Sequence, residues 1–372
     1  MPGTSSHDSM ISTGEQVSTA LLAIAIQALG GKARSILGFQ APIRTDCVFK
    51  DARIEDIGKQ RILDFVKSGH VVVVAGFQGI DCDDNITTLG RGGTDTTAVA
   101  VAAAIGADVC EIYKDVDGIS TTDPHIEPHA RRLDRISYEE VLELASLGAK
   151  VLQIRAVEMG MKHGIPIHVL PESGAGKGTL VVEGDKEMEK IIVSGVALDR
   201  NESKVTVSRV PDQPGVAATL FRPLAEANII VDMIIQNVSE AGYTDLSFTV
   251  RNEDLARVKK IVEPAAKKLK AKRVHTNAKI AKVSVVGLGM RTHAGVAADM
   301  FSALSKGGIN IKMISTSEIK VSCVVDEKYG ELAVRLLHEA FKLDKPRQRI
   351  KSASKKKKAA KKKTAKKKAA KK

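Results

Sequence analysis

The sequence predicts an α/β protein: a sheet covered by helices on both faces, followed by two copies of a smaller βαββαβ module. Apolar runs of strand length alternate with helical segments up to residue 170, a pattern typical of a parallel sheet between two helical layers. A glycine-rich turn at residues 89–94 joins one such region to an Ala/Val-rich helix. Farther on, Gly215-Val-Ala-Ala218 recurs 80 positions later as Gly295-Val-Ala-Ala298, which indicates an internal repeat.

The positive charge of the chain is concentrated in its C-terminal tail. The chain has 372 residues, 43% of them hydrophobic, and a net charge of +13. Residues 345–372 hold 16 Lys and Arg and no acid, so 13 − 16 leaves −3 for residues 1–344. We expect residues 346–372 to be a disordered Lys/Ala-rich tail that binds polyanions non-specifically or has no role in the main activity. The acidic body argues against a nucleic-acid-binding protein.

No secretory signal and no run of 18 apolar residues is visible, so we expect a cytoplasmic protein without a membrane span. The four cysteines, Cys47, Cys82, Cys110 and Cys323, show no CxxC spacing. They are expected to be structural thiols in a reducing compartment.

The elements of the first half follow from apolar spacing and capping residues. Residues 1–10 are polar and small, and we expect them to be disordered. Helices are predicted over residues 16–29, 54–67, 94–104, 137–147 and 151–163. Strands are predicted at 35–39, 70–77, 109–113 and 165–170, the second of them buried on both faces. Ser137 and Glu140 have the spacing of a capping box.

The turn before the Ala/Val-rich helix has the composition of an anion-binding site. Gly90, Gly92 and Gly93 lack a Cβ atom, so the backbone can adopt positive φ and approach a ligand closely. The N–H groups and the dipole of the helix that follows attract negative charge. Arg91 can pair with a carboxylate or phosphate. We therefore expect a binding site here rather than a capped turn with a solvated arginine.

The repeat in the second half predicts an open antiparallel sheet with helices on one face. In the first copy we expect elements at 204–210, 216–227, 229–236, 245–250 and 254–269. Pro223 lies inside the first of its two helices and predicts a kink. A further strand is predicted near residues 191–197, and the sequence leaves open whether it pairs with the first or the second copy. We set the two modules at residues 190–272 and 280–345.

The segment Leu89-Gly-Arg-Gly-Gly-Thr-Asp-Thr-Thr97 and its continuation to Asp123-Pro124 resemble the aspartate kinases of the amino-acid kinase family. The resemblance runs from Ile11 to about Leu343, and the repeated modules resemble tandem ACT modules. It implies a three-layer αβα kinase domain over residues 11–185. It also implies transfer of the ATP γ-phosphoryl group to the β-carboxylate of L-aspartate, the first step towards lysine, threonine and methionine.

The resemblance also implies roles for residues of the turn. Arg91 and Glu15 match substrate contacts, with Arg91 on the α-carboxylate and Glu15 on the ammonium group. Thr94 is expected to donate a hydrogen bond, and the Gly92 and Gly93 amides to line the path of the anion. Asp95 matches the aspartate that orients a catalytic lysine, so Asp95 and Arg91 are the candidate catalytic residues.

A second group resembles the nucleotide-binding face: Lys114, Asp115, Asp117, Gly118, Asp123, Lys150 and Val151. ATP is the implied nucleotide. We expect Mg²⁺ to enter with its phosphates, because the sequence suggests no metal site made only of protein groups.

The first module carries the expected effector site. The turn Asp212–Val216, with Pro214 and Gly215, offers amide groups and a carboxylate to a zwitterion, and Asn228, Asp232 and Gln236 follow it. Lysine, threonine or both are the implied feedback inhibitors. Because ACT modules pair their sheets, we expect a homodimer. In the second module, Arg291–Gly295 and Ser315–Glu318 are expected at an interface.

One departure from the family leaves two readings open. Aspartate kinases begin with a strand that ends in K-[FY]-G-G-[TS]-S, and this sequence does not contain that motif. We therefore expect a kinase domain that is truncated at its N-terminus. The first reading is a feedback-regulated aspartate kinase. The second is a catalytically impaired regulatory subunit that binds amino acids, or a truncated gene model.

Overall fold

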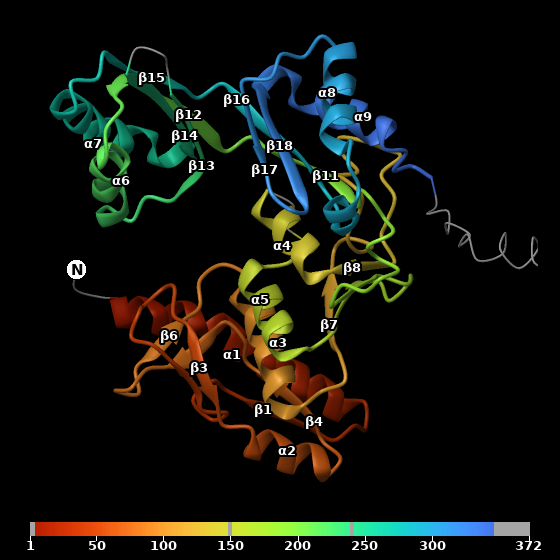
Figure 1. Ribbon diagram of the computed structural model, residues 1–372. Coiled ribbons are helices and arrows are strands. Elements are labelled where there is room, and N and C mark those ends of the chain that lie inside the picture. The colour runs from red at the N-terminus through yellow and green to blue at the C-terminus, as the bar shows by residue number, and fades with distance from the viewer. Residues whose placement is uncertain (1–3, 148–150, 239–241, 346–372) are drawn as a thin grey trace, which may run out of the picture.

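The computed structural model describes residues 4–147, 151–238 and 242–345, so Lys150 and the basic tail lie outside the described residues. The N-terminal domain, drawn red to yellow-green, forms the lower body in Figure 1, and two smaller α/β modules lie above it. The α/β class with two appended modules is therefore confirmed. Within the described ranges, no helix combines the length and the apolar character needed to cross a membrane.

Helix α3 (Gly93–Ile105) lies at the centre of the N-terminal domain. Its small side chains allow close packing on opposite sides. Val99 and Ala102 join a core cluster with Ile112 and Ile167, whereas Ala100 joins a second cluster around Ile36. α3 also packs on α5 (Ile154–His163). This double burial fixes the N-terminal end of α3, where the glycine turn lies.

The strands of this domain form three small sheets instead of the one parallel sheet that we expected. The first sheet pairs β1 (Ala33–Ile36) with β4 (Val71–Val74). The second sheet has the order β7 (Cys110–Lys114), β9 (Ile167–Pro171), β10 (Thr179–Val182) and β8 (Arg135–Ser137). The third sheet has the order β3 (Ile54–Ile57), β2 (Ile43–Thr45), β5 (Gln78–Ile80) and β6 (Ile86–Thr88). The β1–β4, β7–β9, β8–β10 and β2–β5 pairs are parallel, and the others are antiparallel.

Two predictions about individual elements were wrong. The expected helix over 54–67 is a strand, β3, followed by α2 (Gln60–Lys67). Gly58 divides them, and Ile54 and Ile57 pair with β2, so tertiary pairing overrides helical spacing. The strand expected at 70–77 is not buried on both faces. Val71 of β4 is 52% exposed, because β4 pairs with β1 alone.

The N-terminal segment is also not disordered where the structure describes it. Residues 4–10 belong to α1 (Thr4–Ala28), which continues through the helix predicted from residue 16. Asp8 is fully buried, and its Oδ2 accepts hydrogen bonds from the backbone N–H groups of Lys50 and Thr88 at 2.9 and 2.8 Å. These bonds anchor the first turns of the helix, a long-range effect that local composition does not reveal.

Helix α4 (Tyr138–Ser146) begins as predicted. The Ser137 hydroxyl accepts from the Glu140 backbone N–H, and the Glu140 carboxylate accepts from the Ser137 backbone N–H, which completes the capping box. α5 begins three residues later than expected, because Gln153 is extended and its side chain caps Ile154 N–H.

The two modules share one strand order. Module 1 consists of β12 (Glu202–Pro211), α6 (Val216–Glu226), β13 (Val231–Val238), β14 (Tyr243–Arg251), α7 (Leu255–Lys268) and β15 (Arg273–Asn277), with the order β13-β14-β12-β15. Module 2 consists of β11 (Gly195–Asp199), β16 (Ile280–Val286), α8 (Val296–Lys306), β17 (Met313–Thr316), β18 (Lys320–Asp326) and α9 (Gly330–Ala340), with the order β17-β18-β16-β11. Pro223 lies inside α6 as predicted.

The module boundaries differ from our assignment. β11, whose partner we left open although our boundary at residue 190 included it in module 1, pairs antiparallel with β16 of module 2. β15, which we left outside both modules, pairs with β12 of module 1. β11 therefore takes in module 2 the edge position that β15 takes in module 1, and module 1 is inserted between two strands of module 2.

Candidate active site and regulatory modules

The glycine turn is held against the N-terminal end of α5. Gly90 and Gly92 have φ values of 76° and 74°, a region that favours glycine. The Gln153 side-chain amide donates to the Arg91 carbonyl, and a Cβ on Gly92 would lie 2.9 Å from Gln153 Nε2. The Arg91 side chain is exposed. The turn is thus fixed through its backbone, which leaves this guanidinium group available to a ligand.

Asp95 and Lys114 form a salt bridge beside this turn. Asp95 lies in the first turn of α3 and Lys114 at the end of β7. Lys114 Nζ lies 3.0 and 2.9 Å from the two Asp95 carboxylate oxygens, and both side chains are largely shielded from solvent. The two residues that the sequence assigned to separate sites are therefore one unit, with a cation positioned at a helix N-terminus.

The wall of the turn includes residues that the sequence analysis missed. Arg155 of α5 donates to Asp51 Oδ1 at 2.7 Å and to the carbonyls of Ala52 and Leu89 at 3.3 and 3.2 Å. A Cβ on Gly90 would lie 3.0 Å from the Lys50 carbonyl. These contacts fix residues 50–52 against the turn. Because they join distant segments, no local motif marks them.

The other predicted substrate residues belong to different helices, Glu15 to α1 and Thr94 to α3. Glu15 is half-buried within α1, and Thr94 is exposed, with Gly76 beside its methyl group. In the described part of the chain, Arg91 and Glu15 are not joined by an ion pair, and Glu15 has no side-chain hydrogen bond. The α1 side chain that hydrogen-bonds to β6, the strand that leads into the turn, in the described part of the chain is Asp8.

The predicted nucleotide residues lie mostly at the end of β7. Asp115 and Asp117 are exposed, and Gly118 is buried with φ 130°. A side chain at Gly118 would meet Thr179 Oγ1 at 2.5 Å. The Glu172 backbone N–H donates to the Lys114 carbonyl at 2.7 Å, so the loop after β9 borders the same strand end.

Two further residues of that group are placed elsewhere. Asp123 lies on a hairpin, where its carboxylate lies 3.0 Å from His125 Nδ1, and Val151 is half-buried. Across residues 4–147, 151–238 and 242–345, no group of three or more His, Cys, Asp or Glu side chains is arranged to hold a metal ion.

In module 1, most predicted effector residues are exposed. They are Asp212, Pro214, Gly215, Asn228, Asp232 and Gln236, whereas Val216 is buried at the start of α6. Gly215 (φ 92°) precedes that helix directly. The predicted effector residues therefore lie on an exposed turn before α6 and on the chain that follows this helix, and their role in binding an effector stays a prediction.

Asp232 differs from the other exposed effector residues because its carboxylate, with a side chain that is 46% exposed, belongs to an ion cluster between the modules. Lys282 of β16 is 3% exposed and donates to Glu202 and Asp232. Burial raises the pKa of Glu202 to about 7 against the opposing effect of Lys282. For Asp232, burial opposes ionisation, but the hydrogen bond with Lys282 lowers its pKa overall. Asp232 therefore holds the modules together, and its carboxylate is already paired.

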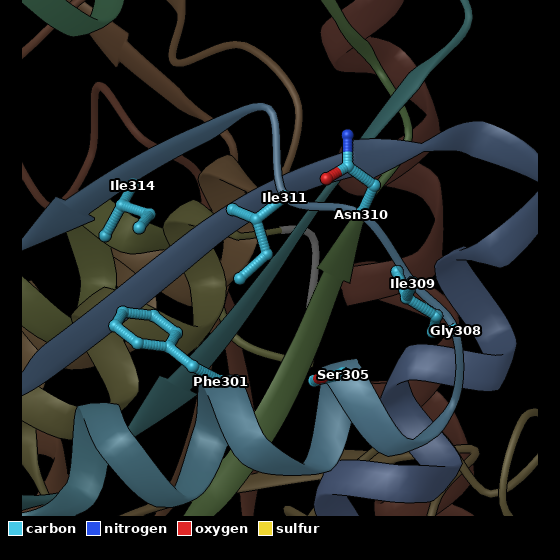
Figure 2. Close-up of a pocket in the computed structure, with 7 residues that line it drawn as sticks. All are labelled: Phe301, Ser305, Gly308, Ile309, Asn310, Ile311 and Ile314. Atoms are coloured by element: carbon cyan, nitrogen blue, oxygen red, sulfur yellow. The ribbon is translucent and has the colours of Figure 1, made fainter.

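Module 2 carries a groove that the sequence analysis did not predict. It has a volume of about 530 Å³ between α8 and the chain that leads into β17. Figure 2 shows Phe301, Ile311 and Ile314 facing it, with Asn310 at the far side. The 80-residue offset relates Phe301 to Phe221 and Ile314 to Ile234. Ile234 is itself 54% exposed, so both modules present an apolar surface at the same edge.

Module 2 also contacts the N-terminal domain directly. Lys320 Nζ lies 2.6 Å from Glu143 Oε2 of α4, and His338 Nε2 lies 3.0 Å from Thr121 Oγ1. Glu140 Oε1 accepts from Ser194 Oγ at 2.5 Å and from the Leu288 N–H at 3.0 Å. Module 2 thus contacts the domain that carries the glycine turn through helix α4 and through the segment around Thr121.

Comparison with known proteins agrees with this architecture. Residues 3–171 match the amino acid kinase family, and residues 205–267 and 283–341 each match an ACT domain. An aspartate kinase from Pseudomonas fluorescens is 55% identical over 91% of this chain and 82% of that protein, and an aspartokinase from Pseudomonas aeruginosa is 54% identical over 91% and 83%.

Solved structures show the same similarity. Escherichia coli aspartokinase III in complex with aspartate and ADP has a TM-score of 0.74 and 28% identity, covering 91% of this chain and 76% of that one. The aspartate kinase of Clostridium acetobutylicum has a TM-score of 0.78 at 26% identity, with 90% and 75% covered. With an amino acid kinase domain followed by two ACT domains, the chain belongs to the aspartate kinase family.

Proposed function

We propose that this chain transfers the γ-phosphoryl group of ATP to the β-carboxylate of L-aspartate, giving 4-phospho-L-aspartate, under feedback control by lysine, threonine or both. The observation that supports this most directly is the Asp95–Lys114 salt bridge at the N-terminal end of α3. The relatives supply the substrates: the related E. coli enzyme is described in complex with aspartate and ADP, and also with lysine and aspartate.

The salt bridge suits phosphoryl transfer, which depends on positioning and on neutralising charge. Asp95 engages Lys114 with both carboxylate oxygens, so the ammonium group has a fixed place. Its remaining N–H can face an oxygen of the transferring group. The N-terminal amides of α3 add donors and the favourable end of the helix dipole. We infer that Lys114 stabilises the transferring phosphoryl group and that Asp95 positions it.

Aspartate must be held so that its β-carboxylate alone meets the nucleotide. We assign the α-carboxylate to the exposed Arg91 guanidinium, which can bind it with two parallel hydrogen bonds. We assign the ammonium group to Glu15 and a further hydrogen bond to Thr94. Because Glu15 has no hydrogen-bond or ion-pair partner for its side chain in the described part of the chain, its carboxylate can accept the ammonium group without first breaking a salt bridge.

The nucleotide is assigned to the end of β7. The exposed Asp115 and Asp117 and the Gly118 backbone follow Lys114 at the end of β7, and the loop after β9 borders the same strand end. We keep Asp123, Lys150 and Val151 as candidate contacts. The cation and the helix N-terminus fit a polyphosphate. We infer that Mg²⁺ enters with ATP and neutralises its phosphates.

The regulatory assignment is part of the same proposal. The turn Asp212–Val216 offers amides to an effector carboxylate, and Asp212 is the carboxylate available for its ammonium group. Exposed apolar edges on both modules favour a homodimer formed by the ACT modules.

The test is ATP-dependent formation of aspartyl phosphate, trapped as the hydroxamate, with and without lysine and threonine. We expect Arg91→Ala to raise the KM for aspartate by roughly 10- to 100-fold, the effect of losing one charged hydrogen-bond pair, and to leave the KM for ATP within about twofold. Arg257→Ala is the matched control, because Arg257 pairs with Asp254 in module 1.

A purified chain that forms no hydroxamate, yet whose melting temperature rises with lysine or threonine, would refute the catalytic proposal and favour a regulatory subunit. Equal loss of activity in both arginine variants would contradict the assignment of Arg91.

A further inference from the structure

Two exposed cysteines lie side by side in the N-terminal domain. Cys47 Sγ lies 3.3 Å from Cys82 Sγ, although 35 residues separate them in the sequence. We expected all four cysteines to be structural thiols. Cys110 and Cys323 are buried, as that expectation requires, but Cys47 and Cys82 are not.

The sheet brings the two cysteines together. β2 and β5 are parallel neighbours with Arg44 opposite Ile80, and each cysteine lies two residues beyond the end of its strand. Parallel strands end at the same edge of a sheet, so the loops that follow them meet there. The Arg44 guanidinium also bridges the loops, since it lies 2.9 Å from Asp84 Oδ1 and 3.2 Å from the Asp81 carbonyl. The contact between the sulfurs thus results from strand register.

We propose that Cys47 and Cys82 are a thiol oxidation site, which closes to a reversible intramolecular disulfide when a peroxide is the oxidant. A disulfide needs its sulfur atoms about 2.05 Å apart, so the two loops must approach by little more than 1 Å. Both side chains are exposed, which gives the oxidant access.

The chemistry has two steps. The Cys47 thiolate attacks one oxygen of hydrogen peroxide, which forms a sulfenic acid and releases hydroxide, and the hydroxide takes up the Cys47 proton as water. Cys82 sulfur then attacks the sulfenic sulfur, forming the S–S bond and releasing a second water as the Cys82 proton is transferred. One peroxide is reduced to two waters, and two thiols are oxidised. A thiol reductant restores both cysteines by exchange.

The order of attack follows from the surroundings of Cys82. Its pKa is raised by the hydrogen bond with Cys47 and then by the charge of Asp83. Cys82 is therefore mostly protonated at neutral pH, which suits the thiol that reacts second. The rate of closure is expected to rise with pH above 7.

Closure would act on the wall of the glycine turn. Residues 48–51 follow Cys47 directly, and they include Lys50, whose carbonyl packs on Gly90, and Asp51, which pairs with Arg155. A disulfide would tie this segment to the loop after β5 and restrict its motion. This consequence concerns structure, so it can be measured whether or not the chain phosphorylates aspartate.

The experiment treats the full chain with excess hydrogen peroxide and analyses it after desalting. We expect the intact mass to fall by the two hydrogens of one disulfide, a Cys47–Cys82 cross-linked peptide, and two of the four thiols to remain titratable in denaturant. Closing a loop of this length should raise the melting temperature by at least roughly 5 °C. Hydrogen exchange at residues 47–51 should slow. Dithiothreitol should reverse each change.

Cys47→Ser and Cys82→Ser are the matched variants, and each should lose both the cross-link and the thermal shift while keeping the unoxidised melting temperature. The proposal is overturned if the wild-type protein forms only disulfide-linked dimers, or if Cys47 and Cys82 both stay titratable. It is also overturned if Cys47 or Cys82 of the wild type is oxidised to sulfinic acid, the product expected when the second cysteine is missing.

Discussion

At the scale of single residues, the Asp95–Lys114 pair shows what sequence can and cannot supply. Both residues were predicted as functional from motif resemblance, but in different roles. Their contact depends on α3 and β7 packing together, which no local pattern encodes. Arg155 and Asp8 are the opposite case. They hold the wall of the turn through bonds to distant backbone groups, and nothing in the neighbouring sequence distinguishes them from ordinary surface residues.

The salt bridge gives the first prediction at this scale. Lys114→Met should reduce kcat by roughly 100-fold or more with a smaller change in the KM for aspartate, because a preorganised charge acts mainly on the transition state. Asp95→Asn should retain more activity, since it frees the lysine but does not remove it. Steady-state kinetics of hydroxamate formation measures both. A Lys114→Met enzyme with wild-type kcat would show that another group carries this role.

The buried cluster at Lys282 gives a second prediction, for stability as a function of pH. Burial raises the pKa of Glu202 to about 7, above its value in the unfolded chain. The folded protein therefore holds a proton that the unfolded chain releases. This stabilising effect is complete below about pH 4.5 and is lost as the pH rises to about 7, a change of roughly 2–3 kcal/mol. Glu202→Gln should flatten this part of the profile.

Urea unfolding at closely spaced pH values between 5 and 8 measures the free energy of unfolding of the wild type and of Glu202→Gln. The informative quantity is the difference between the two curves, because other groups titrate in both. A difference that stays constant with pH would contradict the raised pKa.

At the scale of elements, prediction succeeded where the determinants are local. The capping box at Ser137 and the helix-internal Pro223 were both evident in the sequence and are present in the structure. Prediction failed at residues 54–57, where pairing with β2 converts a helical apolar pattern into a strand. It failed also at residues 4–10, where Asp8 binds two distant backbone amides. The partners of β11 and β15 depend on the insertion of one module into another, which linear order does not reveal.

The start of α4 supplies the prediction at this scale. Ser137→Ala should lower the free energy of unfolding by about 1 kcal/mol, the usual effect of losing an N-cap. Glu140→Ala should cost more, roughly 2–4 kcal/mol, because Glu140 also accepts from Ser194 and from the Leu288 N–H in a buried position. Urea unfolding monitored by circular dichroism compares the two. Equal losses would mean that the bonds to Ser194 and Leu288 add nothing.

At the scale of the whole molecule, α4 connects the catalytic and regulatory parts of the chain. Its capping box lies in the kinase domain, and its outer face meets β11 and β16 of module 2. Module 1 is joined to module 2 through the Lys282 cluster and through the apolar contact of Met233 with Ile280, Met313 and Val324. If an effector binds module 1 as proposed, packed contacts connect it through module 2 to α4.

The Lys320–Glu143 salt bridge is the part of that route which can be removed most cleanly. Lys320→Met should weaken inhibition by lysine or threonine by roughly 3- to 30-fold, within the range expected when a residue couples two sites. Activity without effector should change less than twofold, because neither residue lies at the glycine turn. Lys312→Met is the matched control, since Lys312 pairs with Asp326 inside module 2.

Inhibition curves for the two variants, together with the effector-induced rise in melting temperature, separate loss of coupling from loss of binding. If Lys320→Met lowers the thermal shift as much as the inhibition, the salt bridge supports effector binding itself, and the transmission of the signal must follow other contacts, such as His338 with Thr121.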